Sequence, residues 1–143
     1  MERTIVCYLK NDNKYLMLYR NKKLIDPNKG KWITVGGHIE ENETKEETCI
    51  REVYEETGYN LLNFKYLGIV HFEGDFFQDM YIFVSHSFSG KMHECDEGEL
   101  SWFTKDEIYN LNMWEGDYLF LDKVFKEEKI DMTITYSNGK LVK

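Results

Sequence analysis

Residues 37–59 read GHIEENETKEETCIREVYEETGY, and they carry the strongest signal in the chain. Ten of these twenty-three residues are charged, and the core REVYEE places three glutamates within five residues. The pattern predicts a helix from about residue 44 to residue 57. Gly58 follows at the position where a left-handed C-terminal cap belongs. The segment is therefore expected to be a highly acidic helix that ends at a glycine.

A helical wheel predicts how these side chains are distributed. At about 100° per residue, four residues form one apolar stripe, namely Ile50, Val53, Tyr54 and Thr57. The opposite face then holds Glu52, Glu55 and Glu56, which lie within reach of one another. Like charges at this spacing destabilise a helix by about 0.2–0.5 kcal/mol per pair, and they lie at the end where the helix dipole disfavours negative charge.

Two interpretations of this acidic cluster compete. It is either a solvated helix face with no task or a site for a divalent cation. Three carboxylates with no histidine or cysteine among them select a hard, oxygen-seeking ion, so Mg²⁺ fits, Mn²⁺ is an alternative and Zn²⁺ does not fit. Mg²⁺ held by a few carboxylates characteristically also binds a substrate phosphate.

Length and composition indicate one folded domain over residues 1–143. The chain is 42% hydrophobic and 15% aromatic, which provides enough apolar surface for one core. No apolar run reaches the roughly 20 residues of a membrane span, and the N-terminus lacks the apolar segment typical of a signal peptide. Three widely spaced cysteines favour reduced thiols and a cytoplasmic location.

The charge of the chain restricts its partners. A net charge of −8 and a pI of about 5.0 argue against a protein dedicated to binding nucleic acid polymers. The one basic stretch is the loop-like segment 22–31, which includes Lys23 and Lys31. An anionic small molecule would therefore need this loop, bound cations or both. The sequence does not determine the oligomeric state.

Strands interleaved with two helices are expected along the chain. Residues 4–9 and 15–19 predict a hairpin, residues 32–35 a strand that Gly36 and Gly37 stop, and residues 64–72 and 80–88 two further strands. A short strand over 100–103, a helical turn over 105–110, a helix over 117–128 and a terminal hairpin over 132–142 follow. This interleaving predicts an α/β fold with a mixed sheet covered by helices on both faces.

The spacing within residues 37–59 resembles the Nudix box, the signature of the Nudix hydrolases. The matching positions are Gly37, Glu43, Arg51, Glu52, Val53, Glu55, Glu56 and Gly58. Tyr59 stands where the family prefers an aliphatic residue, and this difference is expected to alter core packing rather than catalysis. The resemblance implies the Nudix fold, an α/β/α sandwich with a mixed β-sheet. It also implies hydrolysis of a nucleoside diphosphate linked to a further group X.

The resemblance also implies roles for individual residues. The implied Mg²⁺ ligands are the Gly37 carbonyl and the carboxylates of Glu52, Glu55 and Glu56. Arg51 and Glu43 are expected to pair and to hold the loop onto the helix. Glu52 or a glutamate from a later loop is expected to deprotonate the attacking water.

Three segments resemble the MutT-type oxidised-purine nucleoside triphosphatases within this family: DEGELSWF (96–103), LNMWEGD (111–117) and the C-terminal ITYSNGKLV. The resemblance implies that Glu97 lies near the metal, that Trp114 stacks on the base and that Asp117 hydrogen-bonds the purine edge. The alternatives are a core aromatic for Trp114 and a helix N-cap for Asp117. Lys23 and Lys31 are expected either to contact the phosphates or to be solvated.

Two positions depart from the animal members of that branch. Gly116 replaces a second acidic residue, and Ile33 replaces an asparagine, so the base preference stays open. The expected function is Mg²⁺-dependent cleavage of 8-oxo-dGTP, or a related oxidised purine deoxynucleotide, to the monophosphate and pyrophosphate. The alternatives are hydrolysis of another substrate, such as a dinucleoside polyphosphate or a nucleotide sugar, and a non-catalytic nucleotide-binding module.

Overall fold

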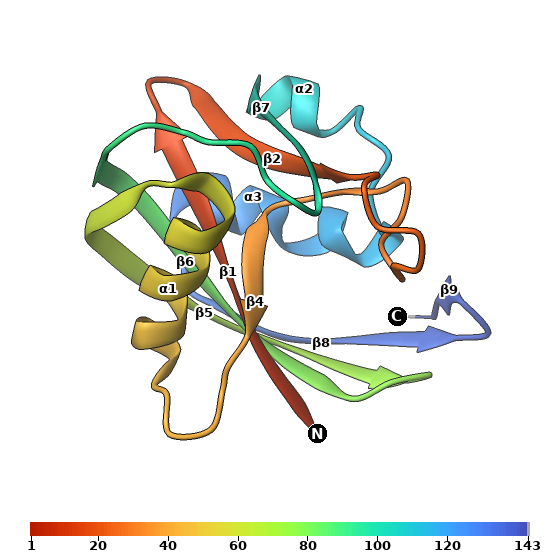
Figure 1. Cartoon of the computed structure of the whole chain (residues 1–143). Helices are drawn as coiled ribbons and strands as arrows, with labels where there is room; N and C mark the ends of the chain where they lie inside the picture. Colours follow the sequence, from red (N-terminus) through yellow and green to blue (C-terminus); the bar gives the residue numbers. More distant parts are fainter. Residues whose placement is uncertain (143) are drawn as a thin grey trace.

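The computed structural model describes residues 1–142, and nine strands form one mixed sheet in it (Figure 1). Strand β1 (Glu2–Asn11) lies in the middle, parallel to β6 (Gln78–Ser89) and antiparallel to both β2 (Lys14–Arg20) and β4 (Val35–His38). The other strands are β3 (Trp32–Ile33), β5 (Asn60–Gly74), β7 (Gly98–Thr104), β8 (Ile130–Ser137) and β9 (Lys140–Leu141). The sheet runs in the order β3-β2-β1-β6-β5-β8-β9, and β7 pairs with β2.

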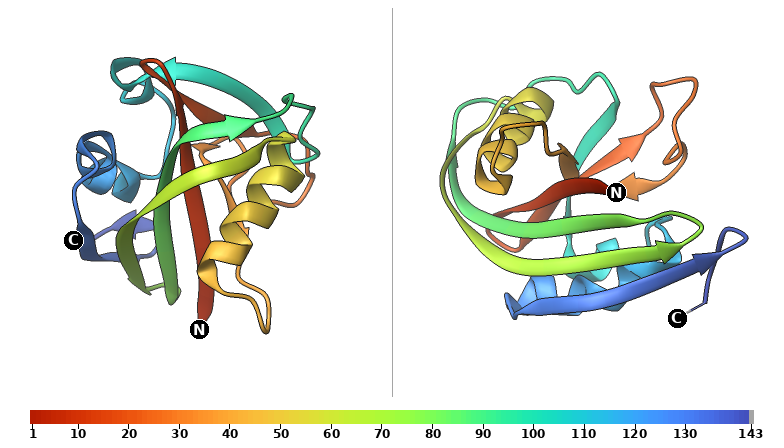
Figure 2. Two further views of the ribbon diagram at one scale, coloured as in Figure 1. Left: turned by 90° about the vertical axis from the view of Figure 1, so that its left-hand side faces the viewer. Right: turned by 90° about the horizontal axis from the view of Figure 1, so that it is seen from below.

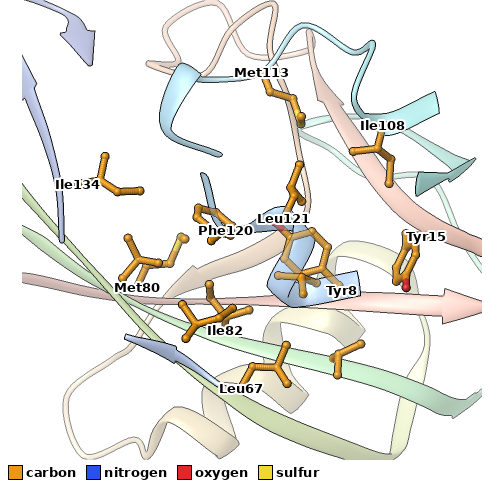
Figure 3. Close-up of a cluster of buried hydrophobic side chains, with 14 of the residues drawn as sticks. Tyr8, Tyr15, Leu67, Met80, Ile82, Ile108, Met113, Phe120, Leu121 and Ile134 are labelled. Atoms are coloured by element: carbon orange, nitrogen blue, oxygen red, sulfur yellow. The ribbon is translucent and has the colours of Figure 1, made fainter. Parts of the chain in front are cut away.

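Two helices cover opposite faces of this sheet (Figure 2). Helix α1 (Lys45–Thr57) packs on one face, where Cys49 and Val53 join a core cluster with Phe83. Helix α3 (Tyr118–Lys126) packs on the other face, where Phe120 and Leu121 join a larger cluster (Figure 3). The short helix α2 (Lys105–Ile108) and the 3-10 turn η1 (Glu115–Asp117) complete the fold. The predicted α/β/α sandwich with a mixed sheet is confirmed.

Local sequence fixes both ends of α1. Thr44 is the N-cap, its side chain accepts a hydrogen bond from the Glu47 backbone N–H at 3.1 Å, and the Glu47 carboxylate accepts one from the Thr44 N–H at 2.9 Å. At the other end Gly58 adopts a left-handed φ of 87°, and its N–H donates to the Tyr54 carbonyl at 2.8 Å. The predicted helix and its glycine cap are both confirmed.

The predicted apolar stripe of α1 is wrong in its orientation. Ile50 and Tyr54 are 46% and 53% exposed, whereas Cys49 and Val53 are fully buried. Glu56 lies on the buried face with 7% exposure, because α1 packs against β4 and β1 with that face. The helical-wheel prediction centred the buried face of α1 on Ile50 and Tyr54. In the structure α1 is rotated, so that Glu56 from its acidic face lies against the sheet.

Several predicted strand ends also move. Gly36 and Gly37 do not stop a strand but lie inside β4, opposite Val6 and Ile5 of β1. A side chain on Gly36 would overlap the Ile5 carbonyl, so glycine permits this close pairing. Strands β5 and β6 extend beyond the predicted ranges 64–72 and 80–88, because the two strands continue to pair with each other out to Asn60 and Ser89.

The predicted helix over 117–128 is shorter than expected. It is preceded by η1, it begins at Tyr118, and it ends at Lys126 because Glu127 takes a left-handed φ of 54°. Elsewhere the three cysteines are free, as predicted, and all three are buried. Among residues 1–142, no helix is both long enough and apolar enough to cross a membrane.

Candidate active site

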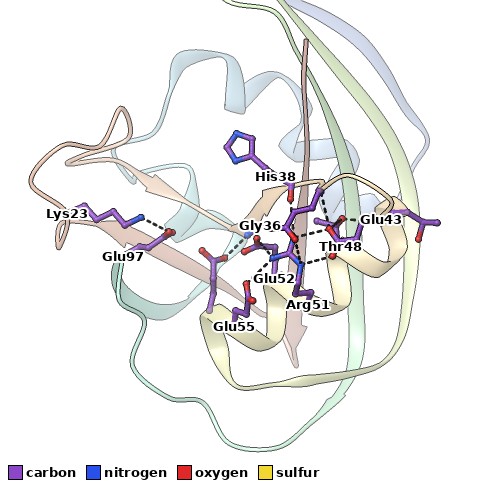
Figure 4. Close-up of polar contacts among 12 residues, drawn as sticks. Lys23, Gly36, His38, Glu43, Thr48, Arg51, Glu52, Glu55 and Glu97 are labelled. Atoms are coloured by element: carbon purple, nitrogen blue, oxygen red, sulfur yellow. Dashed lines mark hydrogen bonds and ion pairs between the residues drawn. The ribbon is translucent and has the colours of Figure 1, made fainter.

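Arg51 organises the acidic face of α1 (Figure 4). Its guanidinium contacts Glu43 twice, with Nε 2.7 Å from Oε2 and an Nη 3.0 Å from Oε1. It also donates to Glu52 at 2.8 Å and to Glu55 at 3.0 Å. Arg51 lowers the pKa of Glu43 to about 2 and its own pKa is raised, so this pair stays ionised. The predicted pairing of Arg51 with Glu43 is confirmed, and the same cation also gathers two of the predicted metal ligands.

Two of the helix carboxylates lie against the glycines of β4. A side chain on Gly37 would overlap the Glu52 carboxylate, so this glycine makes room for the glutamate. The Gly36 N–H donates to Glu56 Oε1 at 2.8 Å. Burial raises the pKa of both carboxyl groups, and it does so strongly for Glu56. The sheet edge and the helix therefore bring Gly37, Glu52 and Glu56 together, while Glu55 lies on the exposed side.

Glu97 reaches the same carboxylates from a different part of the chain. It directly precedes β7, whose first residue, Gly98, pairs with Arg20 of β2. Burial raises the pKa of Glu97, but a hydrogen bond with Glu56 and the charges of Lys23 and Arg20 outweigh that effect and lower it. Burial, and after it the neighbouring Glu97 carboxylate, raise the pKa of Glu56. We call Glu52, Glu55, Glu56 and Glu97 the carboxylate end of the site.

The carboxylate end suits a hard divalent cation by its chemistry. Among residues 1–142, no three His, Cys, Asp or Glu side chains converge closely enough to hold a metal ion as they stand. Instead, Arg51 engages Glu52 and Glu55, and burial beside Glu97 raises the pKa of Glu56. An ion would offset the crowded negative charge, and carboxylate oxygens are the donors that Mg²⁺ prefers. The residues present therefore fit Mg²⁺ or Mn²⁺.

A second group of predicted residues meets about Trp114, and we call Lys31, Trp114 and Asp117 the indole end of the site. Lys31 Nζ lies 5.0 Å from the centre of the Trp114 ring. The indole N–H donates to Asn28 Oδ1 at 2.7 Å. Burial raises the pKa of Asp117 to about 7, although the Lys31 charge opposes this shift. Asp117 occupies the N-cap position of α3, as the alternative predicted, but its side chain makes no capping hydrogen bond there.

The two lysines of the basic loop lie at different ends of the site. Lys23 is 3.1 Å from Glu97, whereas Lys31 lies beside Trp114. Sequence reasoning missed Arg20, Asp26 and Asn28, which link the loop to these residues. The pair Asp26-Pro27 marked only a turn, because the partners of Asp26 are its neighbours Arg20 and Asn28, and only the contacts of those two residues with Glu97 and Trp114 span a long stretch of chain.

The fold and the comparisons define a hydrolase that acts on phosphorus-containing anhydrides. The NUDIX domain family model matches residues 1–124, and the chain belongs to the Nudix family. It is 33% identical over 145 residues to the Bacillus subtilis Nudix hydrolase YvcI, covering 96% of this chain and 88% of that protein. It is 31% identical over 103 residues to the Danio rerio oxidized purine nucleoside triphosphate hydrolase, covering 70% of this chain and 66% of that protein.

The solved structures support the same classification. The crystal structure of the mutator MutT protein from Bacillus halodurans superimposes with a TM-score of 0.88 and is 26% identical. That match covers 100% of this chain and 95% of the other. The chain is thus a MutT-like Nudix hydrolase.

Proposed function

We propose that this protein is a Mg²⁺-dependent nucleoside triphosphate pyrophosphohydrolase that acts on 8-oxo-dGTP or a related oxidised purine deoxynucleotide. The products would be the monophosphate and pyrophosphate, and the role would be sanitation of the cytoplasmic nucleotide pool. The observation that carries the proposal is geometric: one loop places Lys23 against Glu97, beside the helix carboxylates, and places Lys31 and Asn28 against Trp114. Burial also raises the pKa of Asp117 to about 7, so that near neutral pH this group both donates and accepts hydrogen bonds, as the mixed edge of an oxidised purine requires.

The carboxylate end would act on the triphosphate. Nudix hydrolases generally use a divalent metal such as Mg²⁺, and the Gly37 carbonyl, Glu52, Glu55, Glu56 and Glu97 are the proposed ligands. When bound, the metal would neutralise phosphate charge and lower the pKa of a water molecule. Glu52 and Glu97 are the candidates for accepting the proton of that water. Arg51 would keep Glu52 and Glu55 oriented through contacts of 2.8 and 3.0 Å.

The indole end would bind the base. The partly buried Trp114 would provide the stacking surface, because base–aromatic stacking contributes about 1–3 kcal/mol per base. Lys31 is placed to offset negative charge next to this surface. Lys23 would turn from Glu97 towards the phosphates, because it is half-exposed and has a single acidic partner. The similarity to the zebrafish oxidized purine nucleoside triphosphate hydrolase supports this assignment.

Gly116 favours a second candidate function, a broader or different base preference. The Gly116 N–H donates to the Tyr136 hydroxyl at 2.7 Å, and a side chain at this position would overlap Tyr136. The second acidic group of the animal enzymes therefore has no space here. Asp117 would then be the one carboxyl group that hydrogen-bonds the edge of the base. Substrates in which a nucleoside diphosphate is linked to another group X are therefore included in the experiment below.

One substrate panel in ¹⁸O-labelled water tests the proposal. It contains normal and oxidised deoxynucleoside triphosphates, a dinucleoside polyphosphate and a nucleotide sugar, each with Mg²⁺. We expect the highest kcat/KM for an oxidised purine, with pyrophosphate as product. Trp114→Ala should raise KM about 10–100-fold, and Tyr109→Ala, which removes a 38% exposed aromatic ring packed against Phe125, is the matched control. Release of no pyrophosphate from any triphosphate would overturn the proposal.

A non-catalytic nucleotide-binding module is the alternative from another class. All three helix glutamates are present, which argues against it. Turnover by the wild-type protein that Glu55→Gln abolishes would exclude this alternative. Binding of nucleotides without turnover would support it.

A further inference from the structure

The segment between β2 and β3, residues 21–31, touches both ends of the site. Lys23 of this segment contacts Glu97 at the carboxylate end, and Asn28 contacts Trp114 at the indole end. Its base is closed by two backbone hydrogen bonds between Arg20 and residues 30 and 31, of 2.8 and 3.0 Å. The segment is therefore a loop closed at its base by backbone hydrogen bonds, and the side chains packed within the loop determine its shape.

Asp26 fills the inside of this loop. Its side chain is only 2% exposed, and a carboxylate that deeply buried is tolerated only when it is paired and hydrogen-bonded. One oxygen accepts from Arg20 Nε at 2.8 Å, and the other accepts from the Asn28 backbone N–H at 3.0 Å. One oxygen of Asp26 thus contacts Arg20, which in turn contacts Glu97 at the carboxylate end, and the other contacts Asn28, which contacts Trp114 at the indole end.

The contacts beyond Asp26 complete a continuous path. Arg20, which is 14% exposed, also lies 3.3 Å from Glu97 Oε1 through its Nη1. Asn28 Oδ1 accepts the Trp114 indole N–H at 2.7 Å. Glu97 is accordingly joined to Trp114 through Arg20, at the end of β2, and the loop residues Asp26 and Asn28.

Lys23 differs from Arg20 although both contact Glu97. Lys23 is 50% exposed and contacts Glu97 at 3.1 Å, so it can leave when a ligand arrives. Arg20 is held from behind by Asp26, with a charge-assisted hydrogen bond of 2.8 Å. A guanidinium fixed in this way sets where the Glu97 carboxylate stands, because its planar fork has one orientation.

We propose that Asp26 is a positioning residue that couples the place of Glu97 to the place of Trp114. The loop would transmit a change at the carboxylate end to the base-binding surface, so that cation binding prepares that surface. The inference rests on the proposed function, because it takes Glu97 as a metal ligand and Trp114 as the base platform. Asp26 itself touches neither metal nor substrate.

The decisive experiment uses the metal alone, without nucleotide. Mg²⁺ is titrated into ¹⁵N-labelled full-length protein, and the three indole N–H resonances are followed, with Trp114→Phe used to assign its signal. We expect Mg²⁺ to shift the Trp114 resonance in the wild type and the shift to fall by more than half in Asp26→Asn. The apparent Kd for Mg²⁺ should rise about fivefold in that variant.

Two further variants keep the test clear. Arg20→Lys retains the positive charge but not the guanidinium fork, so it should also halve the Mg²⁺-induced shift of the Trp114 resonance. This variant replaces Asp26→Asn in the experiment if Asp26→Asn does not fold. Asp122→Asn removes an exposed acid that pairs with Lys126 on α3, and it should leave the shift unchanged. In the Glu97→Gln background, Asp26→Asn should change the Mg²⁺ affinity by less than about twofold.

Other results would overturn the inference. An unchanged Trp114 shift in both Asp26→Asn and Arg20→Lys would show that the loop transmits nothing, as would full additivity with Glu97→Gln. Failure of the proposed function is distinguishable, because it appears as absent hydrolysis in the substrate panel while these metal titrations are unaffected.

Discussion

The carboxylate end and the indole end of the site are built over very different lengths of chain. Arg51 meets Glu43 across 8 positions, whereas Trp114 meets Asn28 across 86. Loop-closure entropy makes the longer contact about 2 kcal/mol more costly to form. The carboxylate end is therefore set largely by one contiguous segment, and the indole end depends on the completed fold.

The two ends also treat charge differently. At the carboxylate end, Arg51 keeps the pKa of Glu43 near 2 and the acidic groups are paired in advance. At the indole end, Asp117 has a pKa of about 7 because burial outweighs the Lys31 charge. One end is organised around fixed ionic contacts, and the other holds a group that changes its charge near neutral pH. The following four changes test this contrast, from the largest expected effect to the smallest.

Glu56→Gln should have the largest effect. The glutamine still accepts the Gly36 N–H, so the fold should persist, but the negative charge proposed to hold the cation is lost. We expect Mg²⁺-dependent kcat to fall by about 10³-fold or more, measured as pyrophosphate release. Glu46→Gln, at an exposed position near the start of α1, is the control and should keep its activity. A loss of less than tenfold in Glu56→Gln would remove the carboxylate end from catalysis.

Arg51→Met tests the ionic contacts themselves. Removal of the guanidinium leaves Glu43, Glu52 and Glu55 close together without their cation. We expect the free energy of unfolding, measured by urea denaturation, to drop by about 2–3 kcal/mol. Lys45→Met breaks one surface pair with Glu46 and should cost less than about 0.5 kcal/mol. Equal losses in the two variants would contradict the central position of Arg51.

Asp117→Asn tests the titrating group at the indole end. The folded-state pKa of about 7 lies above the ordinary value of 3.8, so the protonated form is favoured by folding. This contribution is complete below pH 3.8 and is lost as the pH rises through 7. The wild type should therefore lose stability over that range, and the variant should not.

At pH 8 we expect Asp117→Asn to be more stable than the wild type by about 1–2 kcal/mol, measured by urea denaturation at several pH values. Asp122→Asn changes an exposed acid on the same segment and serves as the control. Parallel pH profiles for the wild type and Asp117→Asn would mean that Asp117 is not perturbed by burial.

Thr44→Ala should have the smallest effect. It removes one half of the capping box that begins α1, which is expected to cost about 1 kcal/mol of unfolding free energy. Thr104→Ala makes the same change at the four-residue helix α2 and should cost less, because fewer residues depend on that cap. Thermal unfolding of both variants provides the comparison. A larger loss at Thr104 would show that α1 does not depend on its local sequence.

This contrast explains which features the sequence could predict. The glycine cap of α1 and the free cysteines follow from local spacing or composition, and the Arg51–Glu43 pair follows from the resemblance to the Nudix box. The orientation of α1 did not follow, because the close approach of the helix to Gly36 and Gly37 outweighs the bulk of Ile50 and Tyr54. Arg20 escaped notice because the pairing of β2 with β7 brings its partner Glu97 from a distant part of the chain. Asp26 escaped notice because its importance comes through its contact with Arg20.

The 86-residue separation of Asn28 and Trp114 also has a consequence for the order of synthesis. While the chain leaves the ribosome, residues 37–59 are complete long before Trp114 exists, so helix α1 and its ionic contacts can form first. A nascent chain would then have most of its proposed cation ligands but no base-binding surface. Discrimination among nucleotides would be the last property that the protein acquires during its production.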